Sequence, residues 1–171
     1  EILEKQNEIG EPFSFNFVDL ETKDNIAYIT INRPEAMNAL NEIVVAQLTR
    51  RFDEAEKKPD VKAIVFQGAG KAFVAGADIK YFVDKIKADK IADIVEFTRK
   101  GHELLLKIEN ADKLTIALLD GLSLGGGSEL ALACQTIVAT PAGSMGFPET
   151  GIGIFPGMGG MLRMARFAGP E

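Results

Sequence analysis

The sequence predicts a single α/β domain whose strands are largely parallel, and two observations predict it. Apolar runs of strand length at Ile26 to Ile31, Val61 to Phe66 and Thr115 to Leu119 alternate with segments of helical periodicity. The connections between these segments are short, and alternation of this kind is typical of folds in which helices cover a parallel sheet. With 171 residues and 46% apolar composition, the chain is long enough to bury one sizeable core.

The first part of the chain divides into an extension and the start of the domain. Residues 1–12 are interpreted as an N-terminal extension or linker, because Gly10-Glu11-Pro12 breaks the chain before an alternating apolar run begins. The domain is expected to occupy residues 13–171. The alternating run Phe13 to Phe17 predicts its first strand, and Ile26 to Ile31, apolar on both faces, predicts a strand covered on both sides.

The helices are predicted from capping residues and from the spacing of apolar side chains. Asn41 is the expected N-cap of an amphipathic helix that ends near Lys58-Pro59. Its apolar positions are Val45, Leu48, Phe52 and Ala55. Residues 91–109 carry apolar side chains at similar spacing and predict a long helix. The glycines within residues 121–127 lead into a further helix that is expected to begin around Glu129.

Composition and charge exclude several classes of protein. The formal charge is −6, from 19 basic and 25 acidic residues, and no clustered basic surface for nucleic acid is expected. Cys134 is the only cysteine, which excludes an intramolecular disulfide and a cysteine-based metal cluster. The lone His102 is expected to pack or to face solvent rather than to bind a metal. No signal peptide or membrane span is expected, and the predicted compartment is the cytoplasm.

Three segments rich in small residues are candidates for ligand binding, namely Ala72 to Ile79, Gly121 to Glu129 and Phe147 to Gly157. Small residues let backbone N–H groups approach a ligand closely, and a helix N-terminus adds positive potential. Two such N–H groups that converge on one thioester oxygen would form an oxyanion hole. For any one segment alone, turns and tight packing are the more ordinary explanation of the glycines. The sequence contains neither the dinucleotide-binding glycine spacing nor a P-loop.

Two glutamates follow these glycine segments, and each has an ordinary explanation when taken alone. Glu129 would interact with a helix dipole, and Glu149 would be a solvated loop residue. Together, beside an oxyanion hole, they supply what water addition to a conjugated double bond requires: one carboxylate takes a proton from water, and one acid protonates carbon. Two carboxyl groups that share a site cannot both ionise easily, so one pKa is expected to be raised. The sequence leaves open which glutamate holds the proton.

Four motifs in a fixed order resemble the crotonase (enoyl-CoA hydratase/isomerase) superfamily. They are Asn32 to Leu40, Ala75 to Ile79, Gly125 to Glu129, and Pro148-Glu149 with Pro156-Gly157. The resemblance runs from about Phe13 to the end of the chain. It implies the crotonase fold, an α/β spiral of repeated ββα units.

The resemblance also implies roles for individual residues. The N–H groups of Ala77 and Gly126 would form the oxyanion hole, and Glu129 and Glu149 would be the catalytic acid and base. The residues implied to hold coenzyme A are Ala36, Ala75, Gly76, Ala77, Asp78 and Ile79, and Gly157 is implied to line the acyl pocket. Coenzyme A would then be part of the substrate, with no separate cofactor and no metal.

The implied activity is that of a hydro-lyase, an enoyl-CoA hydratase that adds water to trans-2-enoyl-CoA and gives 3-hydroxyacyl-CoA in fatty-acid β-oxidation. Members of the superfamily that keep only one of the glutamates tend to be isomerases or to carry out other CoA chemistry. The presence of both Glu129 and Glu149 therefore favours hydration. An enoyl-CoA delta-isomerase and a non-catalytic CoA-binding fragment are the alternatives.

The sequence departs from the superfamily pattern at both ends. Hydratases of this kind continue beyond the equivalent of Gly169-Pro170-Glu171 into C-terminal helices, so the core is expected to lack this helical part. Those helices close the acyl pocket and build the interface of a homo-oligomer, a trimer or a dimer of trimers. At the other end, residues 1–12 fit a linker behind a fused 3-hydroxyacyl-CoA dehydrogenase domain.

Overall fold

The structure is a computed structural model that describes residues 15–169, so the predicted extension at 1–12 lies outside the described part. The strands are β1 (Val18–Lys23), β2 (Ile26–Ile31), β3 (Ala63–Gly68), β4 (Ala72–Ala75), β5 (Leu114–Leu119), β6 (Leu122–Leu124), β7 (Thr136–Ala139) and β8 (Ser144–Gly146). The α-helices are α2 (Glu42–Lys57), α3 (Ile79–Lys87), α4 (Ile91–Glu109), α5 (Gly126–Ala133) and α6 (Gly160–Ala168). Two 3₁₀ turns, η1 (Pro34–Ala36) and η2 (Pro148–Ile152), complete the description.

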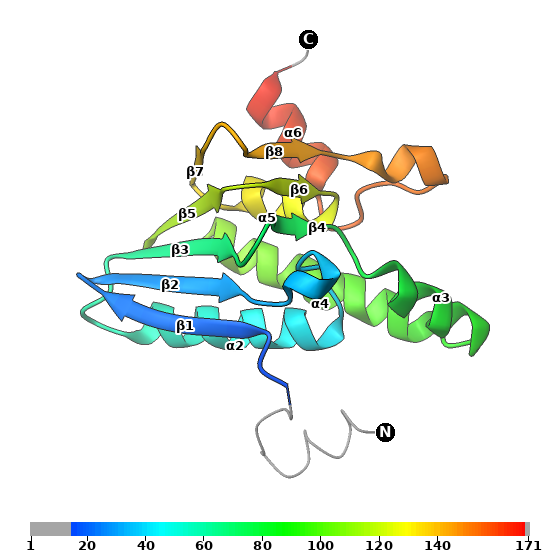
Figure 1. Ribbon diagram of the computed structural model, residues 1–171, viewed down its shortest axis with the longest axis horizontal. Helices are drawn as coiled ribbons and strands as arrows, with labels where there is room; N and C mark the ends of the chain where they lie inside the picture. Colours follow the sequence, from blue (N-terminus) through cyan, green and yellow to red (C-terminus); the bar gives the residue numbers. More distant parts are fainter. Residues whose placement is uncertain (1–14, 170–171) are drawn as a thin grey trace.

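Within residues 15–169 the strands form a five-stranded sheet of order β1-β2-β3-β5-β7 and a three-stranded sheet of order β4-β6-β8. The pair β1 and β2 is antiparallel, and the other described pairs are parallel. The strands β3, β5 and β7 enter the large sheet, and each is followed directly by a strand of the small sheet. Helices follow β4 and β6, which makes the chain a spiral of ββα units (Figure 1). The predicted α/β class and repeated unit are therefore confirmed.

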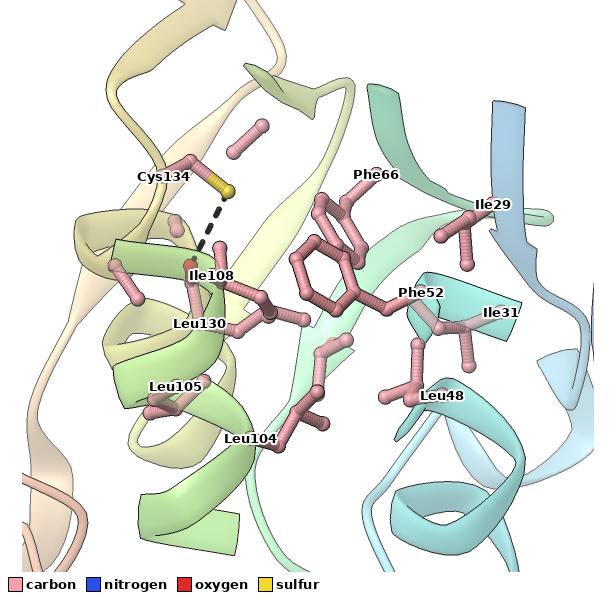
Figure 2. Close-up of a cluster of buried hydrophobic side chains, with 14 of the residues drawn as sticks. Ile29, Ile31, Leu48, Phe52, Phe66, Leu104, Leu105, Ile108, Leu130 and Cys134 are labelled. Carbon is pink, nitrogen blue, oxygen red and sulfur yellow. Dashed lines mark hydrogen bonds between the residues drawn. The ribbon is translucent and has the colours of Figure 1, made fainter. Parts of the chain in front are cut away.

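The hydrophobic core fills the space between the large sheet and the helices α2, α4 and α5 (Figure 2). Its large buried side chains include Ile29, Ile31, Leu48, Phe52, Phe66, Leu104, Ile108 and Leu130. The rings of Phe52 and Phe66 stack with their centroids 6.2 Å apart and join α2 to β3. Full burial of one such side chain stabilises the fold by about 1.5–3 kcal/mol. The core thus holds the sheet and helices in one rigid arrangement around the segments described below.

Most of the long elements have the predicted bounds. The side chain of Asn41 caps α2 by accepting a hydrogen bond from the N–H of Val44 at 3.0 Å, and all four predicted apolar positions of that helix are buried. β2 and α4 begin and end at the predicted residues. The helix expected to begin around Glu129 begins three residues earlier, at Gly126. None of the described helices, including the 19-residue α4, is long and apolar enough to cross a membrane.

The prediction of a strand at Phe13 to Phe17 is wrong for its described part, residues 15–17. The Gln47 side chain accepts from the N–H of Phe17 at 2.8 Å and donates to the carbonyl of Phe15 at 2.6 Å, so this helix residue binds groups that a neighbouring strand would otherwise bind. The edge strand is β1, which pairs with β2 through a turn at Asp24 and Asn25, both of positive φ.

Candidate active site

The carboxyl ends of the three strands of the small sheet lie side by side. Ala75 at the end of β4 pairs with Leu124 of β6, and Leu124 pairs with Gly146 of β8. The predicted oxyanion residues Ala77 and Gly126 each follow one of these paired residues by two positions, and η2 begins two positions after β8. Because parallel strands end at the same edge of a sheet, the three segments meet at one place, where ligands of parallel sheets usually bind.

The backbone N–H of Ala77 points away from its neighbour Leu40. The N–H of Leu40 donates to the carbonyl of Gly76 at 2.8 Å, and the N–H of Asp78 donates to the carbonyl of Leu40 at 2.8 Å. In a parallel bridge of this kind the middle residue turns its own N–H to the opposite side. Within residues 15–169 the Ala77 N–H has no hydrogen-bond acceptor, so it is free to bind a ligand.

The backbone N–H of Gly126 is free for a different reason. Gly126 is the first residue of α5, and the first N–H groups of a helix have no acceptor within it. The side chain of Leu40 lies 3.1 Å from the position that a Cβ on Gly126 would occupy. Leu40 therefore bonds the segment around Ala77 through its backbone and lies next to Gly126 through its side chain. The two residues with the predicted N–H donors are thus both neighbours of Leu40.

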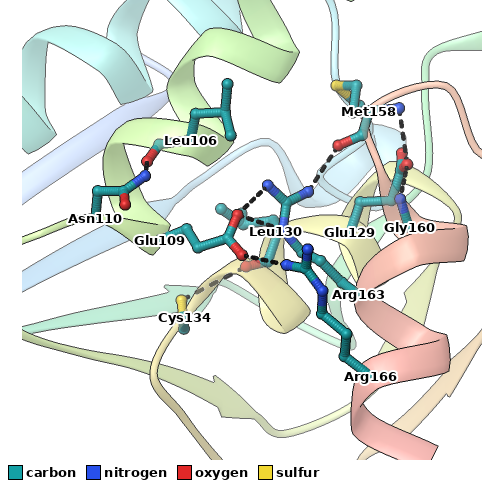
Figure 3. A network of polar contacts seen from close by, with 10 residues as sticks. All are labelled: Leu106, Glu109, Asn110, Glu129, Leu130, Cys134, Met158, Gly160, Arg163 and Arg166. Atoms are coloured by element: carbon teal, nitrogen blue, oxygen red, sulfur yellow. Dashed lines mark hydrogen bonds and ion pairs between the residues drawn. The ribbon is translucent and has the colours of Figure 1, made fainter.

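Glu129 is buried in α5, with 1% of its surface exposed. Its Oε1 accepts hydrogen bonds from the N–H groups of Met158 and Gly160, each at 2.8 Å (Figure 3). Burial raises the pKa of the Glu129 carboxyl; the two N–H donors oppose this rise, and the charge of Glu149 adds to it. The carboxyl group is thus held in one position and binds a proton more tightly than an exposed glutamate does.

Glu149 lies in η2 and is 9% exposed. Its Oε2 is buried and has no hydrogen-bond partner in the described part of the chain. Its Oε1 lies 2.5 Å from the position that a Cβ on Gly125 would occupy, and Oε2 of Glu129 lies 4.0 Å from the corresponding position on Gly126. The structure therefore brings the two predicted glutamates together beside the same pair of glycines. A buried oxygen without a partner is one that a bound water or ligand would satisfy.

The predicted CoA-binding residues also lie close together. Ala36 ends η1, and the carbonyl of the next residue, Met37, accepts from the N–H of Ala75 at 3.0 Å. Arg33 connects the two segments by donating to the Asp78 carboxylate at 2.8 Å. Burial alone would raise the pKa of Asp78, but the Arg33 hydrogen bond and a backbone amide outweigh it and lower the pKa. The carboxylate therefore stays ionised and keeps the two segments joined.

An apolar pocket reaches the same place. It is lined by Leu40, Val45, Leu48, Gly101, Leu104, Leu105, Gly126, Leu130 and Met158. Gly157, which the resemblance assigns to the acyl pocket, is not among these residues and is exposed; a side chain there would first meet Thr98, 3.4 Å away. Ile79 is exposed as well, at the start of α3. Within residues 15–169, no group of three or more His, Cys, Asp or Glu side chains is placed to hold a metal.

Comparison with known proteins identifies the family. A model of the family described as enoyl-CoA hydratase/isomerase matches residues 26–170. The chain belongs to this family. A probable enoyl-CoA hydratase of Mycobacterium tuberculosis is 38% identical over 91% of the chain, and a short-chain-enoyl-CoA hydratase of Clostridium acetobutylicum is 38% identical over 90% of it. The chain spans 58% of the length of each of these relatives.

A solved structure of the family has the same fold. The enoyl-CoA hydratase from Thermoplasma volcanium is 36% identical and superposes with a TM-score of 0.83. The superposition covers 91% of this chain and 61% of that enzyme. The resemblance to the crotonase superfamily and its fold is therefore confirmed.

One residue that holds the candidate site together was not predicted from the sequence. Asn38 is fully buried, and its Nδ2 donates to the carbonyls of Ala69 at 2.9 Å and Ala72 at 2.8 Å. Its Oδ1 accepts from the N–H of Arg33 at 2.9 Å, so it ties the segment around η1 to the start of β4. Its φ of 58° is one that asparagine tolerates better than most residues, which is the one local signal for it.

Ser128 was also missed as a structural residue of the site. Its buried hydroxyl is 2.9 Å from the carbonyls of Ser123 and Gly146, and it accepts from the N–H of Gly146 at 3.1 Å. These contacts join the first turn of α5 to β6 and β8. A serine inside a run of glycines carries little signal of this role, because its partners are backbone groups.

Cys134 takes no part in the site. It is buried, and burial raises the pKa of its thiol, so the reactive thiolate does not form at neutral pH. It packs as a small residue of the hydrophobic core.

Proposed function

We propose that this chain carries the active site of an enoyl-CoA hydratase, which adds water to trans-2-enoyl-CoA and yields 3-hydroxyacyl-CoA. The observation that carries the proposal is the buried pair Glu129 and Glu149, whose carboxyl groups lie beside Gly125 and Gly126 at the start of α5. The relatives that are named as enoyl-CoA hydratases support the same reaction.

The proposed oxyanion hole stabilises the negative charge that develops during the reaction. The thioester carbonyl accepts hydrogen bonds from the N–H groups of Ala77 and Gly126. When water attacks C3, the electrons of the C2=C3 bond move toward this carbonyl oxygen. One donor aimed at such an oxygen stabilises the transition state by about 3–4 kcal/mol. The Gly126 N–H also carries the positive end of the α5 dipole.

The two glutamates divide the proton transfers between them. One carboxylate takes a proton from the water as the water oxygen bonds to C3. The other carboxyl group, protonated at the start, gives its proton to C2, so that one water molecule is added in total. The pair must therefore hold one proton, which the raised pKa of Glu129 and the nearby charge of Glu149 favour. The attacking water would donate a hydrogen bond to Oε2 of Glu149, which has no other partner in the described residues.

The rest of the substrate would lie along segments that meet at the site. Ala36 and residues 75–79 would hold the adenine end of coenzyme A, and the acyl chain would begin beside Gly126. Because coenzyme A is part of the substrate, the reaction as proposed uses no separate cofactor. We place this chemistry in fatty-acid β-oxidation in the cytoplasm. The homo-oligomer and the fused dehydrogenase domain stay predictions.

Hydration of crotonyl-CoA by the complete protein, followed as loss of enoyl absorbance, tests the proposal. Glu129→Gln and Glu149→Gln should each lower kcat about 10²- to 10⁴-fold, the usual contribution of a general acid or base. Glu103→Gln is the matched control, because this glutamate is exposed on α4, and it should keep the wild-type rate. Unchanged rates in both site variants would eliminate the mechanism.

An enoyl-CoA delta-isomerase is the second candidate, and a difference between the two carboxyl groups favours it. Two N–H groups hold Oε1 of Glu129, whereas Oε2 of Glu149 is free, and one free carboxylate suffices to move a proton between carbons. With a 3-enoyl-CoA, a conjugated product without a hydroxyl group supports isomerisation, and absence of that product removes it. Calorimetric binding of acetyl-CoA without any turnover would point instead to a non-catalytic CoA-binding protein.

A further inference from the structure

An ion pair between a buried arginine and a half-buried glutamate lies behind Glu129. Arg163 in α6 is 6% exposed, and its Nε and Nη2 donate to Oε2 of Glu109 at 3.1 Å and 2.7 Å. Glu109 is the last residue of α4, so the pair joins two helices. Desolvation makes a buried ion pair a weak source of stability in itself. Its other contacts therefore decide what it does.

Arg163 also binds the loop that anchors Glu129. Its Nη1 donates to the carbonyl of Met158 at 2.8 Å, and the N–H of Met158 donates to Oε1 of Glu129 at 2.8 Å. Met158 thus faces Arg163 with one backbone group and Glu129 with the other (Figure 3). The second anchor, the N–H of Gly160, belongs to the first residue of the helix that carries Arg163.

Gly159 lets the guanidinium approach this loop. Its φ is +94°, and a Cβ there would lie 2.8 Å from Nη1 of Arg163. A residue with a side chain at 159 would be strained and would displace the arginine. The loop conformation and the position of the Arg163 side chain therefore depend on one another.

We propose that Arg163, oriented by Glu109, is a positioning residue for Glu129: it fixes the loop Met158 to Gly160 so that both N–H donors stay aimed at the carboxylate. The inference rests on the proposed function, because it takes Glu129 as a catalytic group. Arg163 bonds Glu109 and the Met158 carbonyl, so its effect on the reaction passes through the loop that holds Glu129.

The charges around Glu129 give this inference a distinct signature. Glu149 in η2 and Arg163 in α6 act on Glu129 with opposite sign. From α4, Glu109 pairs with Arg163, and the His102 ring lies near Gly159. The strands β4, β5, β6 and β7, which pack against α5, contain no titratable side chain. Loss of the Arg163 charge would leave the negative charge of Glu149 without an opposing positive side chain and would raise the pKa of Glu129.

The experiment compares four variants in the complete protein. Arg163→Met removes the charge and the donors, and Arg163→Lys keeps the charge but replaces the three donating nitrogens of the rigid guanidinium with a single nitrogen. Glu109→Gln removes the charged partner that orients the guanidinium. Arg166→Met is the matched control, because Arg166 is 75% exposed and lies 3.5 Å from Glu109 but makes no hydrogen bond with Met158.

Two measurements are made on each folded variant. The midpoint of the Glu129 carboxyl titration, followed by carbon-13 NMR, should move to higher pH in Arg163→Met. It should stay near the wild-type midpoint in Arg163→Lys and Arg166→Met. With crotonyl-CoA, kcat should fall about 10- to 100-fold in Arg163→Met, because a catalytic carboxyl group misplaced by about 1 Å has this effect on the rate. The fall in kcat should be smaller in Arg163→Lys and Glu109→Gln. KM should change little in all three variants. Arg166→Met should keep the wild-type kcat.

Arg163→Met with the wild-type titration and kcat would overturn the inference, even if the variant unfolds at lower urea. If Arg163→Met does not fold, Arg163→Lys and Glu109→Gln decide the outcome, and wild-type kcat in both would overturn it. A wild-type protein without hydratase activity would refute the proposed function, whereas the NMR titration would still show whether Arg163 acts on Glu129.

Discussion

Replacing Gly125 with alanine should displace the carboxyl group of Glu149 by a predictable distance. The added Cβ would stand 2.5 Å from Oε1 and 3.2 Å from the carboxyl carbon, whereas ordinary contacts begin at 3.4 Å. The carboxyl group must therefore retreat by about 1 Å, and a catalytic group misplaced by this distance costs up to about 100-fold in rate. That loss corresponds to about 2.7 kcal/mol of transition-state stabilisation.

The same substitution also affects stability, because Gly125 has a φ of 48° and a ψ of −118°. Residues with a side chain rarely adopt such a conformation, and holding one there costs about 1–3 kcal/mol. Gly125→Ala should thus lower the free energy of unfolding by about that amount. Urea titration measures this loss and shows the conditions under which the variant stays folded for kinetics.

The kinetic assay is crotonyl-CoA hydration by the folded variant, with kcat and KM determined separately. Gly146→Ala is the matched control at the end of β8, because a Cβ there would meet Leu124 at an ordinary 3.6 Å. The control should keep the wild-type kcat. The reasoning fails if Gly125→Ala keeps a kcat close to that of the wild type, or if Gly146→Ala loses as much.

Three further substitutions test other parts of the structure. Folding raises the pKa of the Glu129 carboxyl above its ordinary value of 4.5, so this group favours folding below that pH and loses the contribution as pH rises through its folded pKa. Glu129→Gln should therefore gain stability relative to the wild type as pH rises above 4.5, and a constant difference in urea titrations would contradict this. Asn38→Ala leaves two backbone carbonyls without their donor, so it should lower the free energy of unfolding by about 1–3 kcal/mol. It should also raise the KM for crotonyl-CoA, and an unchanged KM would show that the segment around η1 does not affect substrate binding. Phe52→Ala should lower the free energy of unfolding by about 3–5 kcal/mol, and a loss below about 1 kcal/mol would refute its place in the core.

The long elements of the fold could be predicted because their patterns extend over several turns or over a complete strand. In α2, four apolar side chains and the Asn41 cap agree, and β2 has β-branched residues at Ile26, Ile29, Thr30 and Ile31. The short strands β4, β6, β7 and β8 contain three or four residues each, too few for a periodic signal. Their pairing joins segments far apart in the sequence: β7 pairs with β5, and β4, β6 and β8 pair with one another.

Two other elements were missed for local reasons. β1 has the alternation of a half-buried strand, but it directly follows the alternating run at residues 13–17, so the first strand was expected too early in the chain. The helix α3 has a local signal in its Asp78 N-cap, but it is short and buries none of its residues fully. Tyr81 and Phe82 hold it by packing against the Phe97 ring, with centroids 5.4 Å and 5.6 Å away. Contacts with a later helix of this kind cannot be seen in a short segment.

The residues that we propose to react could be named from the sequence, but the residues that support them could not. Glu129, Glu149 and the glycines beside them lie in contiguous motifs whose order carries the resemblance to the family. Asn38 and Arg163 act on backbone carbonyls of residues that lie in other elements. A backbone carbonyl is present at every position, so such a partner leaves no mark in the amino-acid order.

The alternation of the chain between two sheets has a consequence for how the protein loses activity on heating or in denaturant. Ala77, Gly126 and Glu149 follow β4, β6 and β8, so three successive turns of the spiral must be docked at once. Transient detachment of a single turn removes one wall of the pocket while most of the core stays packed. Turnover should therefore vanish at milder heat or denaturant than the far-ultraviolet helical signal, and catalysis becomes the more sensitive gauge of structural integrity.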